Sequence, residues 1–179
     1  MTEPAEVPKR DAGESQANEH ALDLLQLRNA LGCFATGVTI ITASGADGKR
    51  VGLTANSFSS VSLNPPLVSL SLSLHSPSLA VFQDASHFAV HVLAREQEDL
   101  AARFAQPADD KYAGLGMTEG LGGAPLLGGA VARFQCRNAY RYYGGDHVIF
   151  LGSVETFDSA PGDPLIFCRG QFGDLAAKS

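Results

Sequence analysis

The most regular pattern of polar and apolar positions lies in the middle of the chain, over residues 67–75. Here small hydroxyl side chains and leucines alternate, as Ser69, Leu70, Ser71, Leu72, Ser73 and Leu74. Successive side chains of a β-strand point to opposite faces, so this period of two predicts a strand. The leucines are expected to face a core, which leaves open what the face of short hydroxyls does.

Short apolar runs bounded by turn residues predict further strands at 37–44, 50–57, 87–93, 131–143, 146–157 and 164–170. Asp47-Gly48, between the first two of these, is a hairpin signal. Apolar residues at helical spacing predict an amphipathic helix over 20–34, through Leu24, Leu27, Leu31 and Phe34. Shorter helices are expected at 76–84, capped by Ser76 or Ser78, and at 95–105. Residues 107–129, rich in Gly and Pro, are expected to form a loop.

The order of these elements indicates the fold class. Strands dominate and follow one another at short spacing, without the regular strand–helix alternation of a doubly wound parallel sheet. We therefore expect a mainly β protein with flanking helices, folded as a small antiparallel barrel.

Composition narrows the class further. The 179 residues suit one domain, assigned to 20–179 after a flexible polar arm at 1–19 that has no apolar signal-peptide core. The net charge of −6 argues against nucleic-acid or membrane partners, and no apolar run is long enough to cross a bilayer. The three cysteines, Cys33, Cys136 and Cys168, form no CxxC pair, so we expect buried thiols and a cytoplasmic protein.

Common catalytic motifs are missing from the sequence. It contains no phosphate-binding P-loop, no nucleophile elbow and no HExxH zinc motif, and GLGMTEG at 114–120 is not a dinucleotide fingerprint. His87 and His91 would share a strand face, but no third ligand is evident, so no metal is expected. The face of short hydroxyls on residues 69–73 has two interpretations. It could let a flat, phosphorylated ligand approach closely, or it could be a solvent-facing sheet surface, where Ser and Thr are also common.

A resemblance favours the first of these interpretations. FATGVTIIT, GLTANSFSSVSLNPPLVSLSL, FAVHVL, RFAQPADDKYAGL, GGDHVIFLGSVE and PLIFCRGQFG occur in this order between about residues 25 and 175. The series resembles the flavin reductase family, the short reductase components of two-component flavin-dependent monooxygenases. The resemblance implies an antiparallel Greek-key split barrel of the FMN-binding type. It also implies a homodimer that uses NADH or NADPH to reduce FMN or FAD for a separate monooxygenase.

The resemblance also implies roles for individual residues. His147 in GGDH would lie beside the nicotinamide and position it, as the catalytic residue. The ring and ribityl chain of the flavin would be contacted by Thr36, Gly37, Thr54, Ala55, Asn56 and Ser57, with Ser60 just after them. Its phosphate would lie near Ser71, Ser76 and Ser78, and its tail near Lys111. The nicotinamide pocket would be lined by Gly145 and Asp146 beside His147, and by Arg169 and Gly170. The segment 74–78, LHSPS, departs from relatives that carry Lys or Arg there, so hydroxyls, amides and Lys111 would have to bind the phosphate.

Two alternatives remain open at this point. The protein could keep FMN tightly bound and reduce another acceptor, or it could bind FMN without catalysis. The sequence also leaves undecided the choice of FMN or FAD, of NADH or NADPH, and the identity of the partner oxygenase.

Overall fold

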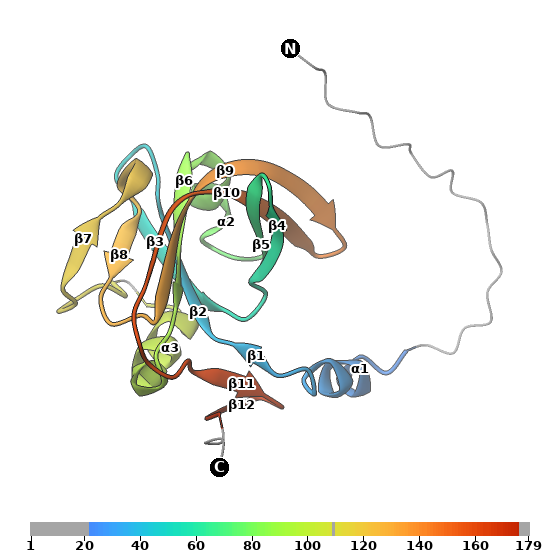
Figure 1. The fold of residues 1–179 in the computed structure, drawn as a ribbon. Helices are drawn as coiled ribbons and strands as arrows, with labels where there is room; N and C mark the ends of the chain where they lie inside the picture. Colours follow the sequence, from blue (N-terminus) through green and yellow to red (C-terminus); the bar gives the residue numbers. More distant parts are fainter. Residues whose placement is uncertain (1–21, 109, 176–179) are drawn as a thin grey trace, which may run out of the picture.

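An antiparallel sheet forms the centre of the molecule in the computed structural model, which describes residues 22–108 and 110–175 (Figure 1). Its strand order is β3-β2-β6-β9-β10-β5-β4. The bounds are β2 Thr39–Ser44, β3 Arg50–Ala55, β4 Ser59–Leu63, β5 Pro66–Ser73, β6 His87–Val92, β9 Ala132–Gly144 and β10 His147–Ser159. Val51 of β3 and Leu70 of β5 belong to one core cluster, so the sheet curls into an open barrel rather than lying flat.

Smaller elements surround this barrel. A three-stranded sheet joins β1 (Thr36–Gly37), β11 (Ile166–Cys168) and β12 (Gln171–Gly173), and β7 (Met117–Glu119) pairs with β8 (Pro125–Leu127). The helices are α1 (Leu24–Leu31), α2 (Leu79–Asp84) and α3 (Glu98–Ala105), with the 3₁₀ turns η1 (Arg95–Gln97) and η2 (Leu121–Gly123). The prediction of a mainly β fold with flanking helices is confirmed.

Strand β2 separates two core clusters by the alternation of its side chains. Ile41 faces the barrel interior, where it packs in the cluster that contains Leu70, Leu72 and Phe150. Its neighbour Ile40 points to the other side and packs in the second cluster, which includes Phe104 of α3. The barrel is therefore packed on both faces of β2, with α3 covering the outer one.

The strand predicted from the serine–leucine alternation is confirmed as β5. Leu70 and Leu72 are buried in the core, whereas Ser69, Ser71 and Ser73 on the other face are partly accessible. Strand β5 pairs with β10 on one side and with β4 on the other.

Several predicted boundaries were wrong. The loop expected over 107–129 contains β7, β8 and η2, and the sequence did not predict β4 or β12. The strand at 37–44 is divided at Val38, and the first helix spans Leu24–Leu31 rather than 20–34. The expected arm at 1–19 lies outside the described residues. The three thiols were expected to be buried, but only Cys136 is buried. Cys33 is exposed and Cys168 is partly buried.

Helix α1 extends away from the barrel (Figure 1). Asp23 caps it, accepting hydrogen bonds from the backbone N–H groups of Leu25 and Gln26 at 2.9 and 3.1 Å. None of its residues is buried, and Leu24 and Leu31 remain 74% and 67% exposed. The apolar stripe predicted for this helix is therefore present, and none of the described residues covers it. Among the described residues, no helix has the length and apolar character that a bilayer span requires.

Candidate functional site

The serine face of β5 forms part of a cavity of about 400 Å³, here called the serine cavity. The end of β3 provides its second wall, and the segment after β5 together with the loop after α3 completes it. The predicted site residues that the cavity brings together are Thr54, Ala55, Asn56, Ser57, Ser71, Ser76, Ser78, Lys111 and His147. Residues far apart in the sequence thus line one hollow because the curled sheet brings β3 and β5 together.

Two hydroxyls of this cavity are used to hold its walls in place. The Thr54 hydroxyl donates to the carbonyl oxygen of Ala101 at 2.6 Å, which fastens β3 to α3. The Ser57 hydroxyl donates to the Ser71 carbonyl oxygen at 3.1 Å and accepts from the Ser71 N–H at 3.0 Å. Both side chains are therefore structural links, and the groups they leave for a ligand are on the backbone.

Other polar groups in the cavity remain free. Within the described residues, neither the Ser71 hydroxyl nor the Asn56 amide makes a side-chain hydrogen bond, and Asn56 is exposed. Free hydroxyl and amide groups provide both donors and acceptors at short reach. They are suited to the carbonyl and nitrogen atoms at the edge of a flat heteroaromatic ring.

His147 opens β10 and lies directly opposite Ser73 of β5 in the strand register. Its Nδ1 lies 2.7 Å from Oδ1 of Asp146, and its side chain is 44% exposed. The hydrogen bond from His147 and its charge lower the pKa of the Asp146 carboxyl below the usual value. With Nδ1 directed at Asp146, the imidazole presents Nε2 as the ring nitrogen available to a ligand.

Lys111 lies at the rim of the cavity, and its ammonium group is already engaged. Nζ donates to the carbonyl oxygens of Phe104 and Gly52, at 2.8 and 3.2 Å. Partial burial lowers the pKa of the amine. Because an ammonium has three N–H donors, one remains for a ligand. Lys111 therefore first fixes its loop against α3 and β3, and second offers a charge at the rim.

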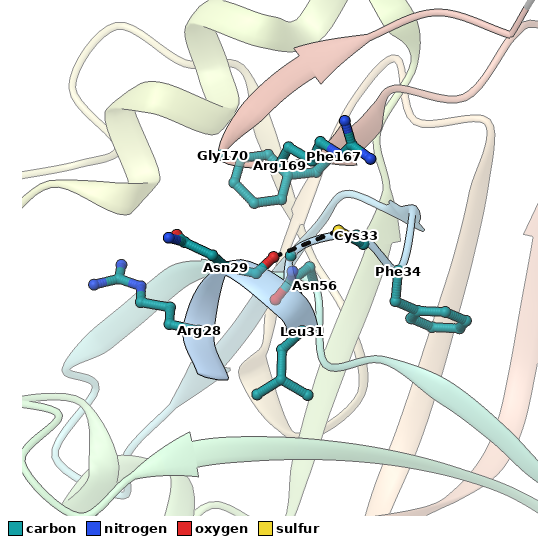
Figure 2. Close-up of a pocket in the computed structure, with 10 residues that line it drawn as sticks. Arg28, Asn29, Leu31, Cys33, Phe34, Asn56, Phe167, Arg169 and Gly170 are labelled. Atoms are coloured by element: carbon teal, nitrogen blue, oxygen red, sulfur yellow. Dashed lines mark hydrogen bonds between the residues drawn. The ribbon is translucent and has the colours of Figure 1, made fainter. Parts of the chain in front are cut away.

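A second hollow, here called the α1 cavity, lies between α1 and the β11–β12 turn and measures about 670 Å³. Figure 2 shows Asn29 of α1 on the side of Arg169 and Gly170, whereas the Leu31 side chain points away from them, and Asn56 lies beside the helix. Asn56 lines both hollows, so the two adjoin at that residue. Of the predicted site residues, Asn56 and Arg169 lie here, together with Gly170.

The comparisons with known proteins point to one family. The sequence profile of the flavin reductase like domain matches residues 31–176. The chain belongs to the flavin reductase family. The predicted recognition, split-barrel fold class and enzyme class are thereby confirmed at the level of the family.

The relatives of this flavin reductase family member are named as flavin reductases or as reductase components of monooxygenases. An FMN reductase (NADH) of Agrobacterium fabrum is 44% identical over 82% of this chain and 83% of its own length. The reductase component of a flavin-dependent trigonelline monooxygenase from Acinetobacter baylyi is also 44% identical, over 86% of this chain. The chain spans only 50% of the length of that second relative.

A solved structure agrees with the assignment to this family. The NADH:FAD oxidoreductase of Streptomyces globisporus, in complex with NAD and FAD fragments, superposes with a TM-score of 0.82. It is 40% identical, and the match covers 86% of this chain and 93% of that one. That neighbour is named for NADH and FAD and was solved with fragments of NAD and FAD, which agrees with the flavin and nicotinamide cofactors predicted from the sequence.

The remaining predicted site residues of this flavin reductase family member lie around the two cavities rather than in them. Gly145 and Asp146 form the turn between β9 and β10, next to His147. Thr36 and Gly37 form β1, which pairs with Phe167 and Ile166 of β11. The Thr36 hydroxyl is buried without a hydrogen-bond partner among the described residues. Ser60 on β4 pairs with Val68 and lines neither cavity.

Sequence reasoning missed several residues that line these cavities. Ser73, Pro77, Phe104 and Pro107 line the serine cavity, and Arg28, Cys33 and Phe34 line the α1 cavity. Ser73 could have been included, because it continues the alternation that contains Ser71. The others come from segments that meet only in the folded chain. Among the described residues, no group of three or more His, Cys, Asp or Glu side chains is placed to hold a metal ion.

Proposed function

We propose that this protein oxidises NAD(P)H and reduces a flavin, FMN or FAD, that it then releases to a separate flavin-dependent monooxygenase. The observation that carries the proposal is the meeting of the β5 serine face with His147 in one cavity. The names of the relatives support the partner, since they include reductase components of two-component monooxygenases.

The residues present fit a flavin. The free Asn56 amide and Ser71 hydroxyl match the hydrogen-bonding edge of its ring, and the short side chains of the β5 face leave room for the ring plane. The buried, unpartnered hydroxyl of Thr36 is a further polar group that lacks a partner within the described chain. When bound, the flavin and the nicotinamide supply the redox chemistry themselves, as hydride acceptor and hydride donor.

The chain's own residues then have three tasks. Asn56, Ser71 and the backbone around residues 54–57 bind and orient the flavin. His147, held by Asp146 through Nδ1, positions the nicotinamide with its free Nε2. Donors placed beforehand at the flavin edge stabilise the negative charge that develops there during reduction. No covalent nucleophile is needed, and the binding of a flavin that leaves again is expected to be modest.

The first test is oxidation of NADH and NADPH, followed at 340 nm, with and without added riboflavin, FMN and FAD. Oxidation that saturates with added flavin supports the proposal. Flavin binding without oxidation of either nicotinamide would instead favour a flavin-binding protein. A flavin that stays bound through purification and passes electrons to another acceptor would favour a tight flavoprotein.

The His147→Ala variant tests the division of roles within the cavity. We expect the KM for NADH to rise about tenfold or more, while the Kd for flavin stays within about twofold, because the proposal assigns His147 to the nicotinamide. His87→Ala is the matched control, because His87 pairs with Glu155 and lies outside the serine cavity. Equal weakening of both ligands in His147→Ala would contradict the assignment.

We further propose that the protein is a homodimer in which α1 packs against the second copy. Leu24, Leu27 and Leu31 lie on a capped helix and are exposed, with Phe34 79% exposed just after it. Apolar surface of this kind on a soluble protein marks an interaction site. The α1 cavity is lined by this same helix, so a second copy that covers α1 would also close one side of the cavity.

A further inference from the structure

A third hollow, of about 830 Å³, adjoins the serine cavity and carries charges that the serine cavity lacks. We call it the basic cavity. Lys49 and Arg50, at the β2–β3 turn, form one side of it, and Asp110 and Lys111 form another. Pro77, Ser78, Pro107 and Lys111 line both hollows, so a ligand can extend from one into the other along this common wall.

The balance of charge in the basic cavity favours an anion. Among the described residues that line it, three side chains are cationic, those of Lys49, Arg50 and Lys111, and one, that of Asp110, is a carboxylate. Within the described residues, neither Lys49 nor Arg50 forms an ion pair, and both are exposed. Arginine and lysine are the side chains that bind phosphate groups by charge-assisted hydrogen bonds.

Hydrogen bonds hold the chain segments that carry Lys49 and Lys111. The Lys49 N–H donates to Oδ1 of Asp47 at 2.9 Å, which shapes the turn that carries both residues. Lys111 is held on the common wall by its hydrogen bonds to Gly52 and Phe104. By contrast, the segment 74–78, whose Pro77 and Ser78 belong to the common wall, offers hydroxyl groups and no full positive charge.

Apolar side chains line part of the basic cavity, beside its cations and the hydroxyl of Ser78. Pro77, Pro107 and Met117 contribute side chains without hydrogen-bonding groups. The Tyr112 hydroxyl is occupied by the Val51 carbonyl oxygen at 2.7 Å, so this ring also presents no free polar group. Apolar side chains beside a cluster of cations suit a ligand that joins phosphates to a flat base.

We propose that the basic cavity binds the adenosine diphosphate portion of FAD, whose flavin ring lies in the serine cavity, so that this protein takes FAD in preference to FMN. The proposal rests on the proposed function, because it places the ring in the serine cavity. NADH contains the same adenosine diphosphate chemistry, and the experiment separates the two sources.

The test measures Kd by quenching of flavin fluorescence for riboflavin, FMN and FAD without any nicotinamide. Wild-type protein is expected to bind FAD about tenfold or more tightly than FMN. The Lys49→Ala/Arg50→Ala double variant should lose about tenfold in FAD affinity, while riboflavin affinity stays within about twofold. Raising the salt concentration should weaken FAD binding more than riboflavin binding, since the charges are exposed. ADP should compete with FAD but not with riboflavin.

Two matched variants serve as controls. Lys49→Arg/Arg50→Lys keeps both charges and should retain most of the preference for FAD. Arg95→Ala removes an exposed cation that pairs with Glu96 and Asp174 and lines none of the three cavities, so the FAD affinity should not change. Circular dichroism checks that each variant is folded.

The outcomes separate the proposal from the proposed function. Equal wild-type affinities for FAD and FMN, or equal losses for both in the double variant, would overturn the FAD subsite while leaving a flavin reductase. Unchanged FAD affinity together with a raised Kd for NADH would assign the cavity to the nicotinamide dinucleotide. Absence of quenching by riboflavin as well as by FAD in the wild type would overturn the proposed function and the subsite together.

Discussion

Arg169 is the one residue other than glycine among the described residues with positive φ, at 51°. It is followed by Gly170 with φ 79°, and the two join β11 to β12, where Cys168 pairs with Gln171. Positive φ at both central positions is the geometry of a type I′ turn, which favours Asn-Gly. Because such a conformation is unfavourable for arginine, we propose that its side chain is retained at the α1 cavity for binding.

Replacing Arg169 with Asn tests this interpretation. Asparagine adopts positive φ more readily, so Arg169→Asn should raise the free energy of unfolding by up to about 1 kcal/mol. The same change should weaken flavin or nicotinamide binding, because the guanidinium is lost from the cavity. Urea unfolding and flavin titration measure the two effects, and a variant that is less stable with unchanged binding would contradict the prediction.

His91 is a buried side chain whose two ring nitrogens are both satisfied. Nδ1 lies 3.0 Å from the Ile40 carbonyl oxygen, and Nε2 accepts from the Leu127 N–H at 3.1 Å. This pairing requires the neutral imidazole. Burial is the main reason that the pKa of His91 falls to about 4, and nearby Arg133 lowers it further.

A pH dependence of stability follows for His91. The unfolded histidine binds a proton near pH 6.5, which the folded one resists until about pH 4. His91 therefore does not reduce the free energy of unfolding above pH 6.5. As the pH drops from 6.5 towards 4, proton binding to the unfolded state lowers this free energy by roughly 3 kcal/mol in all. Urea unfolding at a series of pH values measures this slope. In His91→Gln the slope over that interval should be smaller, and an unchanged slope would assign it to other groups.

At the scale of the element, β5 divides its tasks between its two faces. The side chains of Leu70 and Leu72 build the core, and those of Ser71 and Ser73 line the serine cavity. Changes on the two faces should therefore have separable effects. Ser71→Val should weaken flavin binding by about tenfold, because the new methyl groups enter the cavity and a donor is lost, while stability changes by less than about 0.5 kcal/mol.

The matched variant lies on the other face of the same strand. Leu70 is fully buried and does not line the serine cavity, so Leu70→Ala should lower the free energy of unfolding by about 2–4 kcal/mol through the cavity it leaves in the core. Flavin binding to the protein that remains folded should change little. Chemical unfolding measures the stability of both variants, and fluorescence titration measures their flavin binding. If both substitutions weakened flavin binding to a similar extent, the two faces would not have separate roles.

The difference between strands that were and were not predicted has a physical cause. Strand β5 has a buried face, so its sequence shows the alternation. Strand β4 is an edge strand whose Val61 and Leu63 are exposed, and β7, β8 and β12 span three residues each. Such strands form because a neighbouring strand is available to pair with them, and the pattern of polar and apolar residues within the strand does not encode this pairing. The site shows the same limit, since Ser71 follows from the alternation but Lys49 and Arg50 do not.

At the scale of the whole molecule, α1 is the element whose sequence makes most sense with a second copy present. It has a cap and an apolar stripe, yet none of its residues is buried by the part of the chain that the structure describes. Leu27→Asp/Leu31→Asp places charges on the stripe and should convert a dimer to a monomer, measured by light scattering coupled to size exclusion. The thermal midpoint of the wild type should also rise with protein concentration. A wild type that is monomeric at micromolar concentration would contradict the proposed homodimer.

Strand β5 pairs with β10 over residues 67–73 and with β4 over residues 66–69, and the Ser71 N–H donates to Oγ of Ser57 at 3.0 Å, so these backbone groups are held in place before any ligand arrives. In hydrogen–deuterium exchange, the amides of residues 69–71 should be among the slowest of the protein, with or without flavin. Protection gained on ligand addition should instead appear at 76–78 and 110–112, outside the sheet. Half of the site is thus a rigid template, and adaptation to ligands of different length is left to the segments at its ends.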